Sequence, residues 1–367
     1  MVAPVATNNM HEIFSRGYMQ NGEVLDPDAL RPYVNQKGIS VVSVFAGYRD
    51  VVQNGVHETQ PVYMEKQVYM NALLRKGDWE AIDKEVQDIY RTPLVGIDDL
   101  RSYGLVKSIN DIGVSVTTYE QASDLSPADV SMTLTPKKGD EDLTSFEPVS
   151  TPIPITSKPF SIDLRTLSAS RRNGHEGLDV STARTATIKV REALEDMLFL
   201  GSSVQMGSLP IYGYTTHPNR LANTAGGFGG GDFGTDTNGH KTLVGMIDSL
   251  AALGFPGPFG AYVANAQYRE LLTLTGDNKN ETQLSVILKT IPELKFVRRG
   301  TRLTAGQVVV NQLTKDVVNL VVGQDVTPIS WQEFGGLKND FRIMAAIVPE
   351  IRFDANGNCG VAHATGA

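Results

Sequence analysis

The chain has 367 residues, of which 41% are hydrophobic and 20% charged. This balance is typical of a globular protein that buries one large or two ordinary cores. The formal net charge is −8 and the basic clusters are short, so tight electrostatic binding of nucleic acid is not expected. A single cysteine, Cys359, excludes an internal disulfide and a cysteine-cluster metal site. No apolar stretch approaches the roughly 18–20 residues that span a bilayer, and no secretion signal is evident at the N-terminus, so a membrane partner is not expected either.

Residues 1–60 are predicted to form an arm that lies on another body, followed by two short helices. From Pro61 to Gly77 the apolar residues recur at helical spacing, which predicts a first short helix. A second helix is predicted to begin at Asp78, a good N-cap, and to end before Pro93. Its apolar residues are Trp79, Ile82, Val86 and Ile89. Both apolar stripes are too narrow to form a core by themselves.

Residues 108–178 are predicted to form a long β-hairpin without a core of its own. Ser108–Tyr119 and Val149–Leu167 alternate apolar and polar residues, as strands do. The polar segment 121–148 between them suits an exposed tip. An isolated hairpin is marginal in water, and its edges present unpaired backbone groups. We therefore expect another copy of the chain to cover it.

The segment from Asp179 to Gly201 predicts one long amphipathic helix, with Asp179 as its N-cap and Gly201 closing its C-terminus. Its apolar face consists of Ala183, Ala186, Val190, Leu194, Met197 and Leu198. The opposite face carries charged residues, among them Glu195 and Asp196. We therefore expect the helix to lie half exposed across a core, with this acidic pair available to a basic partner surface.

The remainder of the chain predicts a compact α+β body. The expected helices are 242–253, 265–272 and 282–289, and the expected strands are 261–263, 294–298, 307–311, 317–323, 329–331, 341–348 and 351–353. Helices and antiparallel strands alternate irregularly, which favours an α+β fold over a doubly wound sheet.

Recognisable catalytic or ligand-binding patterns do not emerge from the residues. The glycine run 226–234 lacks the Gly-Lys-Ser/Thr of a phosphate-binding loop and is interpreted as a mobile loop. The segments beginning at Asp232 and Asp354 lack the glutamate that completes a calcium loop, so turns between strands explain them better. The six histidines show no zinc-site spacing. We therefore expect no cofactor, no metal and no enzymatic activity, and a soluble α+β enzyme with an unrecognised site remains an alternative.

Three features in order carry a family resemblance: the long hairpin, the helix ending in Leu194-Glu-Asp-Met-Leu-Phe-Leu-Gly201, and the segment Ile211-Tyr-Gly-Tyr-Thr-Thr-His-Pro218. This order resembles the major capsid proteins of tailed phages and the related encapsulin shells. The later runs Leu320–Asp325 and Phe341–Ile351 resemble the C-terminal part of the same family. The likeness covers about 92–365 and is nearest to the phage branch whose shells are encapsulin-like.

The resemblance implies an α+β phage-capsid/encapsulin shell fold. In that fold, 1–107 would be the N-terminal arm, 108–178 the extended loop, 179–206 the spine helix of the peripheral domain, 207–325 the axial domain, and 326–367 C-terminal strands of both domains. The implied function is a structural major capsid protein that self-assembles through pentamers and hexamers into an icosahedral shell around double-stranded DNA. The alternative from the same resemblance is an encapsulin-type compartment that encloses a cargo enzyme.

The resemblance also implies where the chain acts and what it meets. The expected location is the virion, with assembly in the host cytoplasm. The expected partners are other copies of the chain, a separate scaffolding protein or none, and portal and decoration proteins, with the DNA enclosed rather than bound tightly. The residues we expect at contacts between subunits are Lys137, Lys138, Arg171, Arg172, Glu195 and Asp196. Some relatives crosslink a loop lysine to an asparagine of a neighbour, and Lys137, Lys138 and Asn358 are the candidates here.

Overall fold

The computed structural model describes residues 95–123, 144–163, 165, 181–235, 237–275, 281–333 and 338–367, together with 82, 84 and 86 and the strand segments 19–20, 23–24, 33–34, 40–53 and 56–67. The chain divides into two compact units. The first unit consists of Met1–Thr92, Ile155–Arg191 and Gln324–Ala345. The second consists of Pro93–Pro154, Glu192–Gly323 and Ala346–Ala367. Each unit is therefore built from three separate stretches of sequence.

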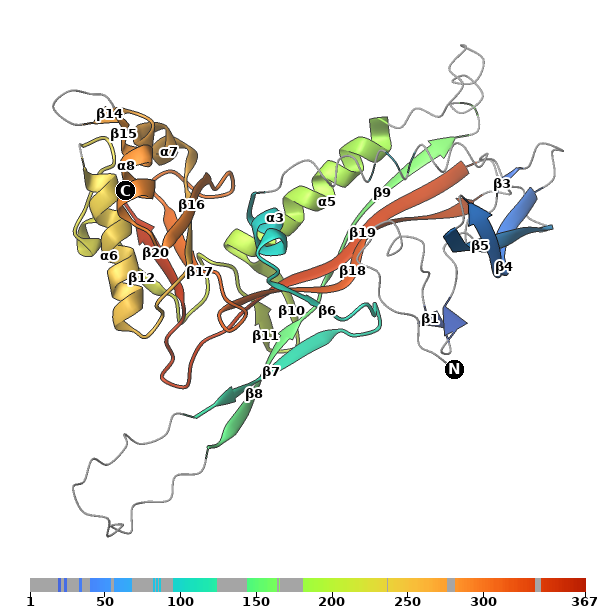
Figure 1. The fold of residues 1–367 in the computed structure, drawn as a ribbon, viewed down its shortest axis with the longest axis horizontal. Helices are drawn as coiled ribbons and strands as arrows, with labels where there is room; N and C mark the ends of the chain where they lie inside the picture. Colours follow the sequence, from blue (N-terminus) through green and yellow to red (C-terminus); the bar gives the residue numbers. More distant parts are fainter. Residues whose placement is uncertain are drawn as a thin grey trace, which may run out of the picture. The chain divides into compact units, whose positions relative to one another are not determined.

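The second unit contains a five-stranded mixed sheet in the order β12-β20-β17-β13-β16 (Figure 1). Its strands are β12 (Leu221–Thr224), β20 (Val361–Thr365), β17 (Val308–Gln312), β13 (Phe259–Val263) and β16 (Leu294–Arg299). The three central strands pair antiparallel, whereas the two edge strands pair parallel with their neighbours. The predicted strands 261–263, 294–298 and 307–311 are confirmed, but the two strands β12 and β20 had not been predicted.

Three helices cover one face of this sheet. They are α6 (Asn238–Ala252), α7 (Asn265–Leu271) and α8 (Gln283–Thr290), and they confirm the three helices expected here. Alternate residues of β13, such as Ala261 and Val263, pack with Leu243 and Ile247 of α6 in one buried apolar cluster. The same cluster includes Phe228 and Phe233 from the glycine run. The interpretation of that run as a mobile loop is therefore wrong, because its two phenylalanines are part of the core.

The other face of the sheet carries an aromatic cluster. The ring of Tyr262 on β13 lies 5.2 Å from that of Phe199, 6.2 Å from that of Tyr214 and 5.5 Å from that of Phe296. Tyr103 follows helix α3 (Val95–Ser102) and contacts Phe296 at 5.7 Å. Helix α3 had not been predicted, because Pro93 was interpreted only as the end of a preceding helix. Both faces of the sheet are covered, which explains why every residue of β13 is buried.

The long helix predicted from Asp179 to Gly201 is confirmed as α5 (Ser181–Leu200). All six residues of its predicted apolar face are buried. Gly201 adopts the left-handed conformation with φ 78°, as expected for a residue that ends a helix. The expected cap Asp179 lies outside the described residues.

A close backbone approach fixes the C-terminal end of α5. A Cβ atom on Gly213 would lie 2.7 Å from the carbonyl carbon of Phe199 and would clash with the amide nitrogen of Gly201. The amides of Tyr214 and Thr215 donate to the carbonyls of Leu198 and Phe199, at 3.0 and 2.9 Å. Glycine at position 213 therefore lets the returning chain hydrogen-bond to the last turn of the helix.

A second apolar cluster of the same unit lies near the C-terminal half of α5. It contains Ile153, Met197, Ile211, Val321, Ala346 and Val348. Three of these residues, Val321, Ala346 and Val348, belong to a four-stranded sheet in the order β6-β18-β19-β9. Its strands are β6 (Val106–Ser108), β18 (Val318–Glu333), β19 (Lys338–Ile351) and β9 (Ile155–Asp163). Strand β18 covers nearly all of the two predicted strands 317–323 and 329–331. Strand β19 covers the predicted strand 341–348 and reaches the start of the predicted strand 351–353.

The first unit includes five N-terminal strands, all of β9, and the parts of β18 and β19 that lie between Gln324 and Ala345. Strands β1 (Met19–Gln20) and β2 (Glu23–Val24) pair with each other, and β3 (Tyr33–Val34), β4 (Ser40–Gln53) and β5 (Val56–Gln67) form a three-stranded sheet. The helix predicted from Pro61 to Gly77 is wrong for residues 61–67, which belong to β5; the rest of it lies outside the described residues. In the second predicted helix, Ile82 and Val86 are helical and buried, as expected.

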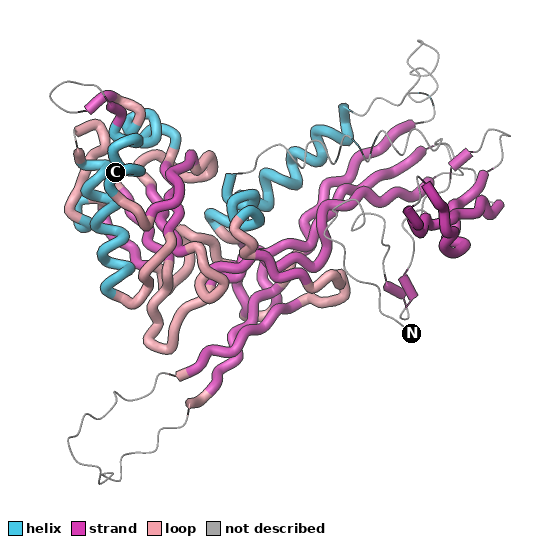
Figure 2. The backbone as a smooth tube through the Cα atoms, in the orientation of Figure 1, coloured by secondary structure: helices cyan, strands magenta, loops and turns pink. Residues whose placement is uncertain are grey.

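Three short two-stranded ribbons complete the fold of the described part, and Figure 2 shows them among the strands. They pair β7 (Val116–Ala122) with β8 (Phe146–Pro152), β10 (Ser202–Met206) with β11 (Leu209–Ile211), and β14 (Leu274–Thr275) with β15 (Glu281–Thr282). A 3₁₀ turn spans Gly226–Phe228. In the described part of the chain, no helix has the length and apolar character needed to cross a bilayer.

Candidate assembly interfaces

The ribbon of β7 and β8 is the described part of the predicted long hairpin. Its register runs from Val116 opposite Pro152 to Ala122 opposite Phe146. The predicted strand 108–119 is in fact two strands, β6 and β7, separated by a turn in which Asn110 has φ 55°. The predicted strand 149–167 is likewise divided into β8 and β9, since Pro154 breaks the backbone pairing. The tip of the hairpin lies outside the described residues.

The two faces of this ribbon have different surroundings. Thr117 and Tyr119 of β7 are 3% and 8% exposed, whereas Thr118 and Glu120, which alternate with them along the strand, are exposed. Phe146, at the far end of β8, is 61% exposed. One face of the ribbon is therefore packed and the other is open to solvent.

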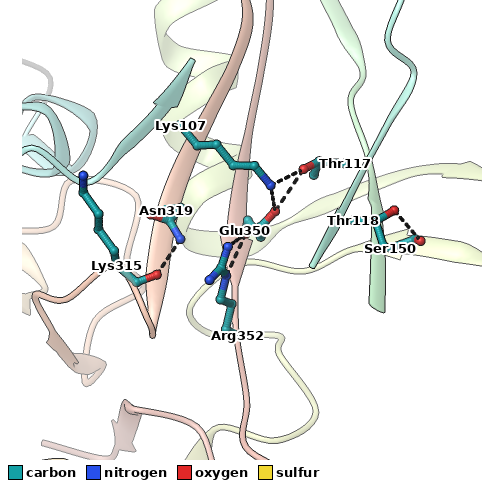
Figure 3. A network of polar contacts seen from close by, with 8 residues as sticks. All are labelled: Lys107, Thr117, Thr118, Ser150, Lys315, Asn319, Glu350 and Arg352. Carbon is teal, nitrogen blue, oxygen red and sulfur yellow. Dashed lines mark hydrogen bonds and ion pairs between the residues drawn. The ribbon is translucent and has the colours of Figure 1, made fainter. Parts of the chain in front are cut away.

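A buried carboxylate holds the packed face at its root (Figure 3). Glu350 of β19 is fully buried. It accepts hydrogen bonds from Arg352 at 2.8 Å, from Thr117 at 3.1 Å and from Lys107 at 3.4 Å. Lys107 of β6 also donates to the hydroxyl of Thr117 at 2.9 Å. A buried charge is costly unless it is paired, so Glu350 needs these partners. The shared hydrogen bonds hold β6, β7 and β19 together at this carboxylate.

The contacts continue along β7 in steps of two residues. The guanidinium of Arg352 lies 5.0 Å from the ring centre of Tyr119, a cation–π distance. The side-chain amide of Gln121 donates to the carbonyl of Asp354. Residues 117, 119 and 121 thus face residues 350, 352 and 354, as two extended segments do when they lie side by side. The ribbon is attached to its own chain as far as Gln121.

This attachment corrects one expectation and retains another. The prediction that the hairpin finds no support in its own chain is wrong for its root, because three side chains of β7 contact 350–354. The opposite face, with Thr118 and Glu120, stays exposed. In the described part of the chain, β7 and β8 have no other strand in their sheet. A surface for a partner therefore remains on the ribbon.

The acidic pair on α5 does not form one exposed surface. Glu195 is 2% exposed and accepts a hydrogen bond from the amide of Gly96 at 3.1 Å, at the start of α3. Burial raises the pKa of Glu195 to about 7, although the amides of Gly96 and Ile97 oppose the shift. The expectation that Glu195 faces a partner is therefore wrong, because the side chain is a buried cap of α3.

Asp196, the other member of the pair, is half-buried and binds within its own chain. Its carboxylate lies 3.2 Å from Arg302, which also lies 3.7 Å from Glu192. Surface ion pairs of this kind contribute little to stability. Asp196 thus remains a candidate for a contact between subunits, with Arg302 as its present partner.

A second buried carboxylate links α3 to the sheet. Asp99 accepts a hydrogen bond from the hydroxyl of Tyr262 at 3.2 Å and pairs with Arg298 at 3.1 Å. Burial raises the pKa of Asp99 to about 6, and Arg298 opposes that shift. Arg298 is thus bound within its own chain. In the sequence, the visible sign of this contact was Asp99 itself, an acidic residue in a segment for which no helix or strand had been predicted.

The other residues expected at contacts between subunits stay as predictions. Lys137, Lys138, Arg171 and Arg172 all lie outside the described residues. Asn358, the crosslink candidate, is described: its side-chain amide donates to Asp354 at 3.2 Å. It lies in the turn between Phe353 and Cys359. The interpretation of this segment as a turn is therefore confirmed.

Two histidines of the second unit, His217 and His363, pack as uncharged side chains. His217 and His363 are 4% exposed, and burial lowers the pKa of each to about 4. Arg220 donates to the ring of His363 at 3.4 Å and opposes its protonation. Among the described residues, no group of His, Cys, Asp and Glu has an arrangement that holds a metal ion.

Exposed apolar side chains gather on and next to the β10–β11 ribbon. They are Leu200, Val204, Met206 and Tyr212, between 37% and 58% exposed. The ribbon segment Ser202–Ile211 contains no charged residue. Sequence reasoning missed this surface, although the lack of charged residues in the segment was visible.

Solved structures that resemble this one are phage capsid and virus-like particle structures. A virus-like particle from Pyrococcus furiosus has 16% sequence identity and a TM-score of 0.57, over 78% of this chain and 98% of that chain. The capsid of Myoviridae phage XM1 has 13% identity and a TM-score of 0.54, over 75% and 94% of the two chains. A structure from Microbacterium phage Oxtober96 has 14% identity and a TM-score of 0.51, over 71% and 89%.

These similarities confirm the phage-capsid/encapsulin shell fold that the order of the hairpin, the long helix and the α+β body had indicated. At this identity they establish the fold. No curated protein matches the chain in sequence. The chain belongs to the family of unknown function DUF6260, whose profile matches residues 70–364.

Proposed function

We propose that this chain is the major capsid protein of a tailed phage, a structural subunit that assembles with copies of itself into a closed shell around double-stranded DNA. The observation that carries the proposal is the β7–β8 ribbon in the context of the shell fold. Its root is fixed by Glu350, while its other face and the side chain of Phe146 are exposed. A monomeric protein does not benefit from such a ribbon, because its exposed edges favour association.

Many modest contacts give such a shell its stability. Interfaces of standard size bury about 1,600 Å², and a subunit that engages several neighbours at once gains from multivalency. In this proposal the ribbon, the β10–β11 surface and Asp196 supply contacts of this kind. The pentamers and hexamers, the scaffolding, portal and decoration partners, and the assembly in a host cytoplasm belong to the same proposal.

The proposal also assigns a role to each part of the chain. Residues 207–325 and β20 form the axial domain, α5 forms the spine of the peripheral domain, and 1–107 form the N-terminal arm. The five-stranded sheet supports this division, because it combines 221–312 with the C-terminal strand β20 in one unit. The boundary of the axial domain in this proposal therefore takes in 361–365.

Size measurements on the purified chain test the proposal. Size-exclusion chromatography with negative-stain microscopy is expected to show megadalton particles or free capsomers. Elution as an oligomer smaller than a pentamer, at a low multiple of 39.8 kDa, would favour an enzyme or another role outside a shell. The net charge of −8 also predicts that shells form without nucleic acid, and assembly only upon addition of DNA would contradict that expectation.

An encapsulin-type compartment is the second candidate function. The observation that favours it is the similarity to the Pyrococcus furiosus virus-like particle, which extends over 98% of that chain. This candidate predicts particles of one small size that copurify with a cargo protein and contain no DNA. Nuclease digestion of purified particles, followed by extraction and sequencing of protected nucleic acid, distinguishes the two functions.

A further inference from the structure

The backbone hydrogen bonds of the β7–β8 ribbon have a defined phase. At one end the amide of Ile153 donates to the carbonyl of Ser115 at 2.8 Å, and at the other the amide of Ser123 donates to the carbonyl of Ser145 at 2.8 Å. In an antiparallel pair, bonded and non-bonded positions alternate. The odd-numbered residues of both strands therefore bond across the ribbon, and the even-numbered residues direct their N–H and C=O groups outward.

The outward edge of β8 lacks half of its donors. Its outward positions are Phe146, Pro148, Ser150 and Pro152. Proline has no N–H group, and within sheets it is confined to positions such as these. The strand β11 also lies next to β8 without joining its sheet. Pairing of another strand along β8 is therefore blocked at alternate positions.

The outward edge of β7 keeps all of its backbone N–H and C=O groups. Its outward positions are Val116, Thr118, Glu120 and Ala122, each with an N–H and a C=O. Within the described part of the chain, none of these four amides donates a hydrogen bond. The edge contains no proline and no lysine, and Glu120 is its single charged residue, whereas natural sheets protect a free edge with proline and with charged side chains, above all lysine. The edge strand β16, in contrast, carries Lys295, Arg298 and Arg299.

We propose that β7, and not β8, is the strand of the ribbon that pairs with an extended segment of a second copy of this chain. The inference rests on the proposed function, since a shell subunit presents the same edge in every copy and meets itself at the highest local concentration. The packed face of the ribbon is occupied by 350–354 of its own chain. A partner strand therefore adds to the ribbon at its edge, by backbone pairing of the kind known as β-augmentation.

Two proline substitutions at directly opposite positions test this polarity. Thr118 and Ser150 are register partners, and their hydroxyl groups share one hydrogen bond of 3.0 Å. Thr118→Pro and Ser150→Pro both remove that hydroxyl bond, and neither removes an N–H that bonds across the ribbon. Only Thr118→Pro removes a donor from the edge of β7. The pair is thus matched except for the edge that it alters.

The expected result is a difference in assembly. Thr118→Pro should raise the protein concentration needed for particle formation by about tenfold or more, since one contact is lost in every subunit. Ser150→Pro should stay within about twofold of the wild type. Equal effects of the two substitutions, or a larger effect of Ser150→Pro, would overturn the proposal. Urea denaturation of the unassembled chains controls for folding, because both variants should unfold at the same midpoint.

Hydrogen exchange provides a second test that needs no substitution. On assembly of the wild-type chain, the amides of Thr118, Glu120 and Ala122 should gain protection, whereas those of Phe146 and Ser150 should not. Protection of Phe146 and Ser150 instead would show that the polarity is reversed. If the wild-type chain forms no particles, the proposed function itself fails; if particles form without protection at β7, only the edge assignment fails.

Discussion

Replacement of Glu350 by glutamine should release the root of the hairpin. The carboxylate is fully buried and is the shared acceptor of Arg352, Lys107 and Thr117. Removal of one partner from a buried charge network costs about 3–5 kcal/mol, because the remaining charges lose their counter-charge. Lys107 and Arg352 are 36% and 26% exposed and can regain part of their hydration. We therefore expect a loss of about 3 kcal/mol, at the lower end of that range.

Urea denaturation of unassembled chains, followed by far-UV circular dichroism, measures this loss. Hydrogen exchange of Thr117 and Tyr119 should accelerate in the same variant, because the network holds β7 on 350–354. The matched control is Glu281→Gln, which removes the charge of an exposed carboxylate that pairs with Lys289. The control should leave the unfolding midpoint unchanged. A Glu350→Gln variant as stable as this control would refute the assigned role of the network.

Three further predictions concern the second unit. Burial raises the pKa of Glu195 to about 7 from its ordinary value of 4.5. The folded chain therefore binds more protons than the unfolded chain between these values, and the contribution of Glu195 to stability is full below pH 4.5 and lost as the pH rises through 7. Glu195→Gln should remove this part of the slope in urea denaturation across pH 4.5–8, and an unchanged slope would argue against a buried titrating carboxyl. Gly213→Ala should cost about 3 kcal/mol by backbone overpacking, whereas Gly207→Ala, with φ 64° and no atom within 4 Å, should cost only about 1 kcal/mol; equal thermal shifts would contradict this. Burial also raises the pKa of Cys359 to about 12, so the thiol should react with a disulfide reagent only after unfolding, and rapid labelling of the native chain would count against its burial.

Much of the fold was predictable wherever periodic apolar residues meet one continuous core. Helix α5 is the best example, since its apolar face, its length and its terminal Gly201 all appear in the sequence. The helices α6, α7 and α8 follow the same principle. Strand β20 was missed because Val361–Thr365 is short and almost wholly buried, and such a strand shows no alternation of apolar and polar residues.

The candidate interfaces were less predictable, because their main features depend on long-range contacts. The charge of Glu195 suggested exposure, yet the residue caps α3, which lies 99 positions earlier in the chain. The root of the ribbon likewise depends on Glu350, which is 233 positions from Thr117. Local patterns predict which segments are strands and helices, but they do not show which buried polar groups will meet.

The central claim is that the β7–β8 ribbon joins one copy of the chain to the next in a closed shell. A cryo-electron-microscopy map of particles purified from the wild-type chain tests it most directly. We expect β7 of one copy to continue into a sheet with a strand of an adjacent copy, while residues 117–121 stay on 350–354 of their own chain. A map in which the ribbon meets no neighbour, or a preparation that contains only small soluble oligomers, would contradict it.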